Sequence, residues 1–279
     1  MQTEAHIITI ANQKGGSGKS TISANLALKL LEYSPKTLVM DTDPQKSIES
    51  FCNIRQDESR EYSKLPHFHL SNRTGNISES IKQNLQMYDF IIIDTGGIDS
   101  IEARKAMLFA DSILLPTVPS QYDFDVLCAM LQTITDITEI NEEAKVSILM
   151  NKISPNPMLH KEISDFANAI KQVLEQHLQA RLDRFILLEN YLSERIAYKR
   201  AVSEGYGITQ YSDEKAKAEF ERFFDEFVEL NIPHLAQKHL KNNAQQAQSN
   251  ESNKPKKTQE SSLDSKQARL KQDNAKMGA

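Results

Sequence analysis

The chain has 279 residues, of which 39% are hydrophobic and 25% charged, a balance typical of a soluble globular protein. No run of 18 apolar residues occurs and no secretory-signal pattern is present at the start, so we expect a cytoplasmic protein without a membrane span. The two cysteines, Cys52 and Cys128, lie outside any C-x-x-C pair. This excludes a disulfide framework and a four-thiolate metal site within one chain.

The net charge of −5 is unevenly distributed along the chain. Residues 241–279 are rich in Gln, Asn, Ser and Lys and contain eight basic and four acidic residues, a net +4. A segment of this composition cannot bury enough apolar surface to offset its ordering entropy. We therefore predict a folded domain over residues 1–240 and a disordered, basic tail over 241–279. The remainder carries −9, so only a local basic patch would favour nucleic-acid binding.

Short apolar runs alternate with amphipathic stretches through most of the chain. The runs are rich in Ile, Val and Leu and predict buried strands at residues 6–11, 37–41, 90–94, 112–117 and 146–151, with a weaker candidate at 66–70. The amphipathic stretches predict helices at 19–31, 45–53, 77–87, 101–109, 123–138 and 159–178. From residue 184 to 240 the pattern is mostly helical. Strand–helix alternation predicts an α/β fold with a mostly parallel, twisted sheet flanked by helices.

A glycine-rich loop follows the first predicted strand and opens the first predicted helix. Residues 12–21 read Asn-Gln-Lys-Gly-Gly-Ser-Gly-Lys-Ser-Thr. Its three glycines allow a tight turn that brings backbone N–H groups against phosphate oxygens, and the helix N-terminus adds partial positive charge. In such a P-loop Lys19 reaches the β- and γ-phosphates, the Ser20 hydroxyl binds Mg²⁺, and Thr21 donates to the α-phosphate. The alternative is a glycine-rich turn that only begins a helix.

The loop departs from the general P-loop pattern in one respect. Gln13 stands where that pattern has its first glycine, and Lys14 follows it. The run Lys-Gly-Gly-Ser-Gly-Lys-Ser resembles the deviant Walker A motif of the ParA/MinD superfamily. The resemblance implies a Mg²⁺-dependent ATPase that dimerises around ATP, with Lys14 reaching the phosphates held by the partner; the alternative is a solvated loop lysine. The implied ATP-binding residues are Lys14, Gly15, Gly16, Ser17, Gly18, Lys19, Ser20, Thr21 and Asn151.

Two acidic segments agree with this resemblance. Asp41 to Gln45 follow the second strand and resemble the D-x-D-P-Q segment of ParA-type ATPases. There the acid matching Asp43 positions the attacking water, and the one matching Asp41 supports the P-loop and the Mg²⁺ shell. Capping of the next helix is the alternative. Asp94 ends the third long apolar run as a Walker B aspartate does, and so is expected to hold Mg²⁺.

Three further positions follow the same order. Gly96 and Gly97 after Asp94 would let the backbone approach the γ-phosphate. Residues 115–120, followed by Asp123, resemble a P-x-x-P-S segment near the dimer interface of the family, although proline can simply end a strand. Asn151, before Lys152, resembles the residue that binds the adenine base, because its amide offers both a donor and an acceptor.

The helical end carries a third signature. Residues 194–201 and the turn at 205–208 resemble the C-terminal region of small ParA proteins, where basic residues contact DNA phosphates. Mixed acidic neighbours make a solvated helix face the alternative. The candidate DNA-binding residues are Arg195, Lys199, Arg200, Lys215, Lys217 and Arg222.

The resemblance therefore implies a small ParA-type ATPase that partitions a plasmid or chromosome. It would bind nonspecific DNA as an ATP dimer, associate with the nucleoid, and be released by a ParB-like centromere-binding or adaptor protein. Because the P-loop begins near residue 13, we expect no N-terminal helix-turn-helix domain. The alternatives are a positioning ATPase for a protein cargo, a MinD-like membrane-surface ATPase, for which the tail lacks an apolar face, and a metallocluster or biotin-pathway relative.

Overall fold

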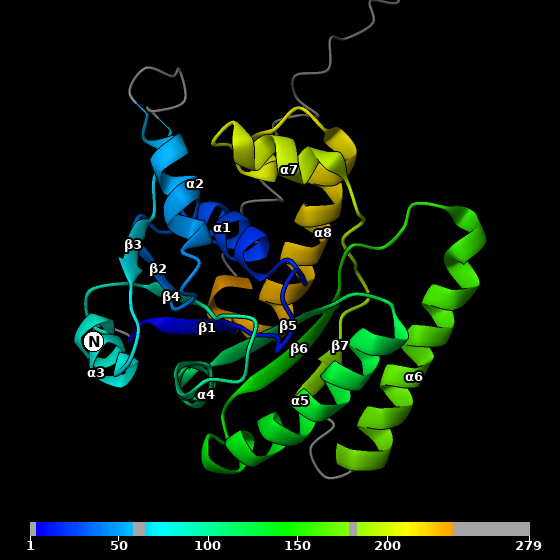
Figure 1. The fold of residues 1–279 in the computed structure, drawn as a ribbon. Coiled ribbons are helices and arrows are strands. Elements are labelled where there is room, and N and C mark those ends of the chain that lie inside the picture. The colour runs from blue at the N-terminus through cyan, green and yellow to red at the C-terminus, as the bar shows by residue number, and fades with distance from the viewer. Residues whose placement is uncertain (1–3, 58–64, 179–182, 237–279) are drawn as a thin grey trace, which may run out of the picture. The chain divides into compact units, whose positions relative to one another are not determined.

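The computed structural model describes residues 4–57, 65–178 and 183–236 (Figure 1). The described strands form one seven-stranded sheet, and every pair of neighbouring strands is parallel. Their order across the sheet is β3 (His69–Asn72), β2 (Thr37–Asp41), β4 (Phe90–Asp94), β1 (His6–Ile10), β5 (Ser112–Thr117), β6 (Lys145–Met150) and β7 (Phe185–Leu187). The predicted α/β class with a parallel sheet is confirmed.

The α-helices occur where the periodicity predicts them, with shifted ends. They are α1 (Lys19–Leu30), α2 (Ser47–Arg55), α3 (Ile77–Asn84), α4 (Ile101–Phe109), α5 (Gln121–Ile140), α6 (His160–Leu178), α7 (Ile196–Ser203) and α8 (Glu214–Asn231). Short 3₁₀ turns, η2 (Pro157–Leu159) and η3 (Ile208–Gln210), precede α6 and α8. No helix among the described residues is long and apolar enough to cross a membrane.

The mostly helical reading beyond residue 184 is wrong at its start. Residues Phe185–Leu187 form β7, which pairs with β6 in the register Val146↔Phe185. A three-residue strand is too short to show a period, and pairing with β6 rather than local sequence defines it. The predicted domain end at 240 and the tail lie outside the described residues, and the described elements belong to a compact unit that ends at Pro233.

The two faces of the sheet are covered by different helices (Figure 1). Side chains alternate along a strand, so Ile7 and Ile91 face one side while Ile8 and Ile92 face the other. The first pair belongs to a core shared with α3, α4, α5 and α6. The opposite face is covered by α1 and by α8, whose buried phenylalanines are Phe220, Phe223, Phe224 and Phe227. Because the strands are apolar on both sides, the polar residues concentrate at the strand ends.

The chain changes winding direction at β1, which lies between β4 and β5. In such sheets the ligand crevice opens at the carboxyl ends of the strands beside this point. The register aligns Ile10 with Asp94 and Asp94 with Asp41. The loops that follow β1, β2 and β4 therefore meet at one edge.

Candidate functional site: a nucleotide pocket at the carboxyl edge of the sheet

The loop between β1 and α1 has a backbone that only glycine adopts readily. Gly16 and Gly18 have φ of 81° and 96°, in the left-handed region. A Cβ on Gly18 would also lie 2.3 Å from Nδ2 of Asn151, which donates to the Ser17 carbonyl over 2.7 Å. The glycine spacing therefore serves both the turn and close packing against the β6 loop.

A cavity of about 610 Å³ opens in front of this loop. Its first wall is the P-loop and the start of α1, and its second is the segment from Leu192 to Val202. Pockets of this size hold nucleotide-sized ligands. The predicted ATP residues that line it are Gly15, Gly16, Gly18, Lys19, Ser20, Thr21 and Asn151, joined by Asp43. Ser17 is buried beneath the loop, and its hydroxyl has no partner among the described residues.

Lys19 extends back across the loop that precedes it. Its Nζ donates to the carbonyl oxygen of Lys14 over 3.1 Å, and the side chain is nearly buried. Burial lowers the pKa of this ammonium, while the nearby carboxylates of Asp94 and Asp43 oppose the shift. A buried cation beside a glycine-rich cradle is suited to the charge of phosphate oxygens.

Asp94 lies fully buried at the end of β4, next to α1. Its Oδ1 accepts a hydrogen bond from the Ser23 hydroxyl over 2.7 Å, whereas Oδ2 is buried without a partner among the described residues. Burial raises the pKa of Asp94 to about 7, although the neighbouring Ser20 and Ser23 hydroxyls lower it. Ser23 was not predicted as a site residue. Its spacing of three from Ser20, on one helix face, was the available signal.

This arrangement fits Mg²⁺ bound in the P-loop manner. The unpartnered Oδ2 of Asp94 and the Ser20 hydroxyl next to it are hard oxygen donors. Among the described residues, no group of three or more His, Cys, Asp or Glu could hold a metal. Mg²⁺ needs no such cage, because it is held by one or two protein oxygens together with water and phosphate.

The two aspartates after β2 differ in their surroundings. Asp41 is buried, and its oxygens accept from the backbone N–H groups of Asp43 over 2.9 Å and Ile48 over 3.3 Å. Burial raises its pKa although these N–H groups oppose the shift. Asp41 therefore braces the β2–α2 loop, whereas the N-cap position of α2 is Lys46, which makes no side-chain cap hydrogen bond. Asp43 lines the cavity instead, and a Cβ on Gly96 would lie 4.0 Å from its Cγ.

Gly97 packs against the P-loop itself. A Cβ added there would lie 2.9 Å from Gly15 N and 3.2 Å from Lys14 C. The sequence predicted an approach of this glycine to a phosphate. In the structure Gly97 lines the cavity, and its loop also packs against the P-loop backbone.

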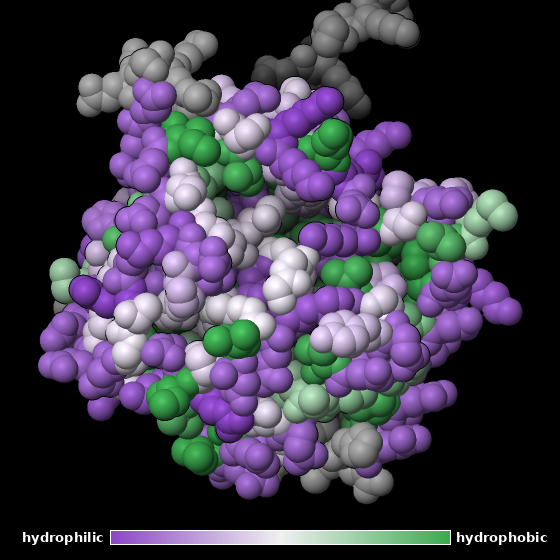
Figure 2. Space-filling view, in the orientation of Figure 1, coloured by the Kyte–Doolittle hydropathy of each residue, from purple (hydrophilic) through white to green (hydrophobic). Residues whose placement is uncertain are grey.

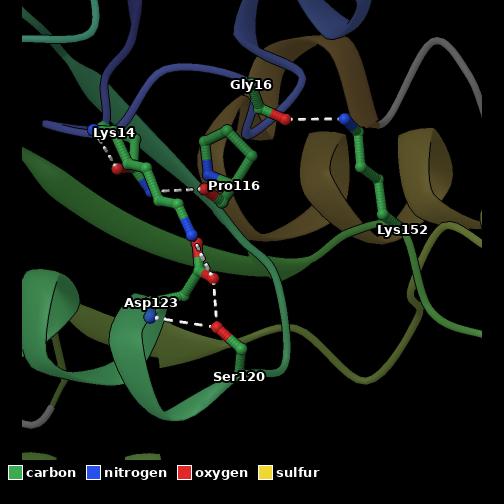
Figure 3. Close-up of polar contacts among 7 residues, drawn as sticks. Lys14, Gly16, Pro116, Ser120, Asp123 and Lys152 are labelled. Carbon is green, nitrogen blue, oxygen red and sulfur yellow. Dashed lines mark hydrogen bonds and ion pairs between the residues drawn. The ribbon is translucent and has the colours of Figure 1, made fainter.

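Lys14 is outside the set of residues that line the cavity, and its side chain points toward Asp123 in the first turn of α5 (Figure 3). Its Nζ forms an ion pair with Asp123 Oδ2 at 2.6 Å and lies 4.7 Å from the centroid of the Tyr122 ring. The segment that precedes Asp123 was predicted to lie near a dimer interface. The contact between Asp123 and Lys14 was not predicted.

Lys152, next to Asn151, also binds the P-loop. Its Nζ donates to the Gly16 carbonyl over 2.6 Å, and its φ of 55° is rare for a residue with a side chain (Figure 3). Sequence reasoning did not place it in the site, although its position beside Asn151 at a strand end was a signal. Through these two residues, the loop after β6 holds the outer side of the cradle.

The six candidate DNA-binding residues do not share one environment. Arg195 forms an ion pair with Glu219 of α8, with Nε 3.0 Å from Oε2. Arg195 and Lys199 line the cavity wall, and Lys199 and Arg200 are exposed on α7. Helix α8 carries Lys215, Lys217 and Arg222 among six acidic residues, so it is not a positive stripe.

A P-loop, a strand-end aspartate beside it and a parallel sheet together define a P-loop nucleotide-binding fold. The family model of the ATPase MipZ matches residues 6–217, and the chain belongs to this family. The resemblance to the ParA/MinD superfamily is thereby confirmed.

Individual relatives carry names that describe different roles. The maintenance of carboxysome distribution protein A of Halothiobacillus neapolitanus is 24% identical over 210 residues, covering 74% of this chain and 88% of that protein. The chromosome partitioning protein ParA of Myxococcus xanthus is 27% identical over 179 residues, covering 52% and 63%. The solved ATP complex of McdA from Cyanothece aligns with a TM-score of 0.63 at 18% identity and covers 82% of this chain and 96% of that one.

Proposed function

We propose that this ATPase binds Mg²⁺-ATP in the cavity and uses hydrolysis as a timed switch between a dimer and a monomer. The observation that carries the proposal is the cradle itself. The backbone of the P-loop glycines and the Lys19 side chain line the cavity. Asp94 has an unpartnered oxygen, and the Ser20 hydroxyl lies next to this carboxylate. Bound Mg²⁺ would neutralise charge developing on the phosphates. Asp43 would orient the attacking water from the opposite side.

Substitutions at two residues test this site. Lys19→Ala removes the buried cation, and hydrolysis should fall by about a hundredfold or more, with weaker ATP binding. Asp43→Ala should retain ATP but lose hydrolysis, which accumulates the dimer. A normal rate in Asp43→Ala would show that another group positions the water. Lys46→Ala, an exposed neighbour of the same loop, is the matched control and should hydrolyse ATP normally.

As the cellular role we propose segregation of DNA, in which the ATP dimer binds nonspecific DNA and a ParB-like or adaptor partner triggers release. The likeness to chromosome partitioning ParA supports this role. In the face drawn in Figure 2, hydrophobic residues occur in small groups among hydrophilic ones. This suits reversible association better than a permanent interface, which is more apolar.

A second role, positioning of a protein cargo over the nucleoid, is favoured by a specific observation. The carboxysome distribution relative is matched over 88% of its length. Both roles share the ATP cycle and differ in the partner. Binding to random-sequence duplex DNA with ATP, ADP or no nucleotide, at two salt concentrations, tests what they share. Salt-sensitive binding only with ATP supports it. Absence of binding by an ATP dimer contradicts the DNA-tethered cycle.

A further inference from the structure

The loop lysine that follows Gln13 is held within its own protomer. The Lys14 ammonium lies 2.6 Å from Asp123 Oδ2 in the first turn of α5 (Figure 3). It also lies over the ring of the neighbouring Tyr122. The Lys14 side chain remains 31% exposed, so its tip is anchored at the protein surface rather than enclosed.

The backbone at this position is fixed independently of that contact. The Lys14 N–H donates to Asn12 Oδ1 over 2.8 Å, and Asn12 Nδ2 donates to the Pro116 carbonyl over 2.7 Å. These bonds tie the start of the P-loop to the end of β5. The ammonium can therefore leave Asp123 by changing side-chain rotamers alone, without displacing the cradle.

Lys14 is the cation that faces the buried Asp123 carboxylate. The Asp123 side chain is 2% exposed, and its Oδ1 has no partner among the described residues. Oδ2 accepts from the Ser120 hydroxyl and from Lys14. When Lys14 leaves, the carboxylate retains only the Ser120 hydroxyl and the N-terminal dipole of α5. Removing one member of a buried ion pair is strongly unfavourable because the other charge stays desolvated.

We propose that Asp123 is a positioning residue that holds Lys14 in its own protomer and thereby opposes ATP-dependent dimerisation. The inference rests on the proposed dimer switch and on the role that the family resemblance implies for Lys14, which is to reach phosphates held by the partner subunit. One ammonium cannot bind Asp123 and a phosphate of the partner subunit at once. The ion pair therefore raises the protein concentration that is needed to form the nucleotide-bound dimer.

The test compares two acids that are two residues apart on α5 and differ in burial. Asp123→Asn keeps the shape and the side-chain hydrogen bonding but removes the charge. Asp125→Asn makes the same change of net charge at an exposed site whose partner is Gln121. Dimerisation of the full chain is measured by sedimentation with Mg²⁺ and a non-hydrolysable ATP analogue, which keeps hydrolysis out of the result. We expect Asp123→Asn to dimerise at about a tenfold lower protein concentration, and Asp125→Asn to match the wild type.

A second measurement follows Lys14 directly. In nucleotide-free protein, the rate of amine labelling at Lys14, read by mass spectrometry, should rise severalfold in Asp123→Asn and stay unchanged in Asp125→Asn. If the wild type dimerises and Asp123→Asn changes neither the dimerisation concentration nor the labelling rate of Lys14, the proposed restraint of Lys14 by Asp123 is overturned. The proposed function then still stands. If neither the wild type nor Asp123→Asn dimerises, the result contradicts both the proposed dimer and the proposed restraint of Lys14 by Asp123. If Asp123→Asn dimerises and the wild type does not, the result supports the proposed restraint of Lys14 by Asp123.

Discussion

Two adjacent glycines give a sharp test of the docking between the β4–α4 loop and the P-loop. A Cβ on Gly97 would lie 2.9 Å from Gly15 N, 3.0 Å from Gly15 Cα and 3.2 Å from Lys14 C. All three atoms are backbone and cannot rotate away. Since ordinary contacts lie near 3.5 Å or beyond, Gly97→Ala has to displace one loop by about 0.5 Å. Overpacking of this kind costs about 1–3 kcal/mol in the free energy of unfolding.

Gly96→Ala is the matched control, because its nearest atoms lie 3.9–4.0 Å away, which is ordinary contact. Neither position has the left-handed backbone that would penalise any side chain. Thermal unfolding of the nucleotide-free protein should show Gly97→Ala melting roughly 2–10 °C lower and Gly96→Ala close to the wild type. The affinity for ADP should fall with the first variant alone, since the displaced loop carries the cradle. Equal melting temperatures for the two variants would refute the docked arrangement.

Three other predictions concern the body of the fold. Arg55 is 1% exposed and donates to the carbonyls of Pro66 and Gly205 and to the Gln210 side chain. Arg55→Met leaves the buried Gly205 carbonyl unpaired and should lower the free energy of unfolding in urea by about 2 kcal/mol. An unchanged urea midpoint would contradict this. Burial raises the pKa of Glu219, but hydrogen bonds from Arg195 and Ser193 outweigh it, and the net pKa lies below the ordinary 4.5. The stability that this carboxylate contributes is complete above pH 4.5 and is lost as the pH falls through the lowered pKa. The melting-temperature gap between wild type and Glu219→Gln should therefore close in acid, and a gap independent of pH would refute the ion-pair account. A chain ending at residue 240 should hydrolyse ATP within twofold of the full-length rate, and loss of that rate would show that residues 241–279 belong to the ATPase domain.

The sequence predicts the site well where chemistry and strand ends coincide. The loops after β1, β2, β4 and β6 each begin at the end of an apolar run, and parallel strands bring their carboxyl ends to one edge. Glycine spacing predicts the cradle because two of its positions need a left-handed backbone. Asp94 and Asn151 follow from the same reasoning, since each ends or directly follows such a run.

Contacts between these loops could not be predicted, because they depend on register and on distances of a few ångströms. Lys14 to Asp123 spans 109 positions in sequence, and Arg55 to Gly205 spans 150. A charged residue on an amphipathic helix, such as Arg55, is expected at the surface. Its burial depends on the η3 loop packing against α1 and α2, which no local pattern reveals. β7 was missed for a related reason, since its partner β6 defines it.

The charge distribution limits the number of basic residues that are available to bind DNA phosphates. The Arg195 charge is paired with Glu219, and α8 carries twice as many acidic as basic residues. Counterion release requires basic groups that are free to approach phosphates. On the described helices that follow β7, Lys199 and Arg200 of α7 meet this condition best, because they are exposed and no carboxylate on α7 itself separates them. The segment 241–279 supplies a further net +4 against −9 for the rest of the chain. We therefore infer that a DNA-binding dimer would use α7 together with this segment. The slope of affinity against salt concentration should then be shallower in the chain ending at residue 240 than in the full-length protein.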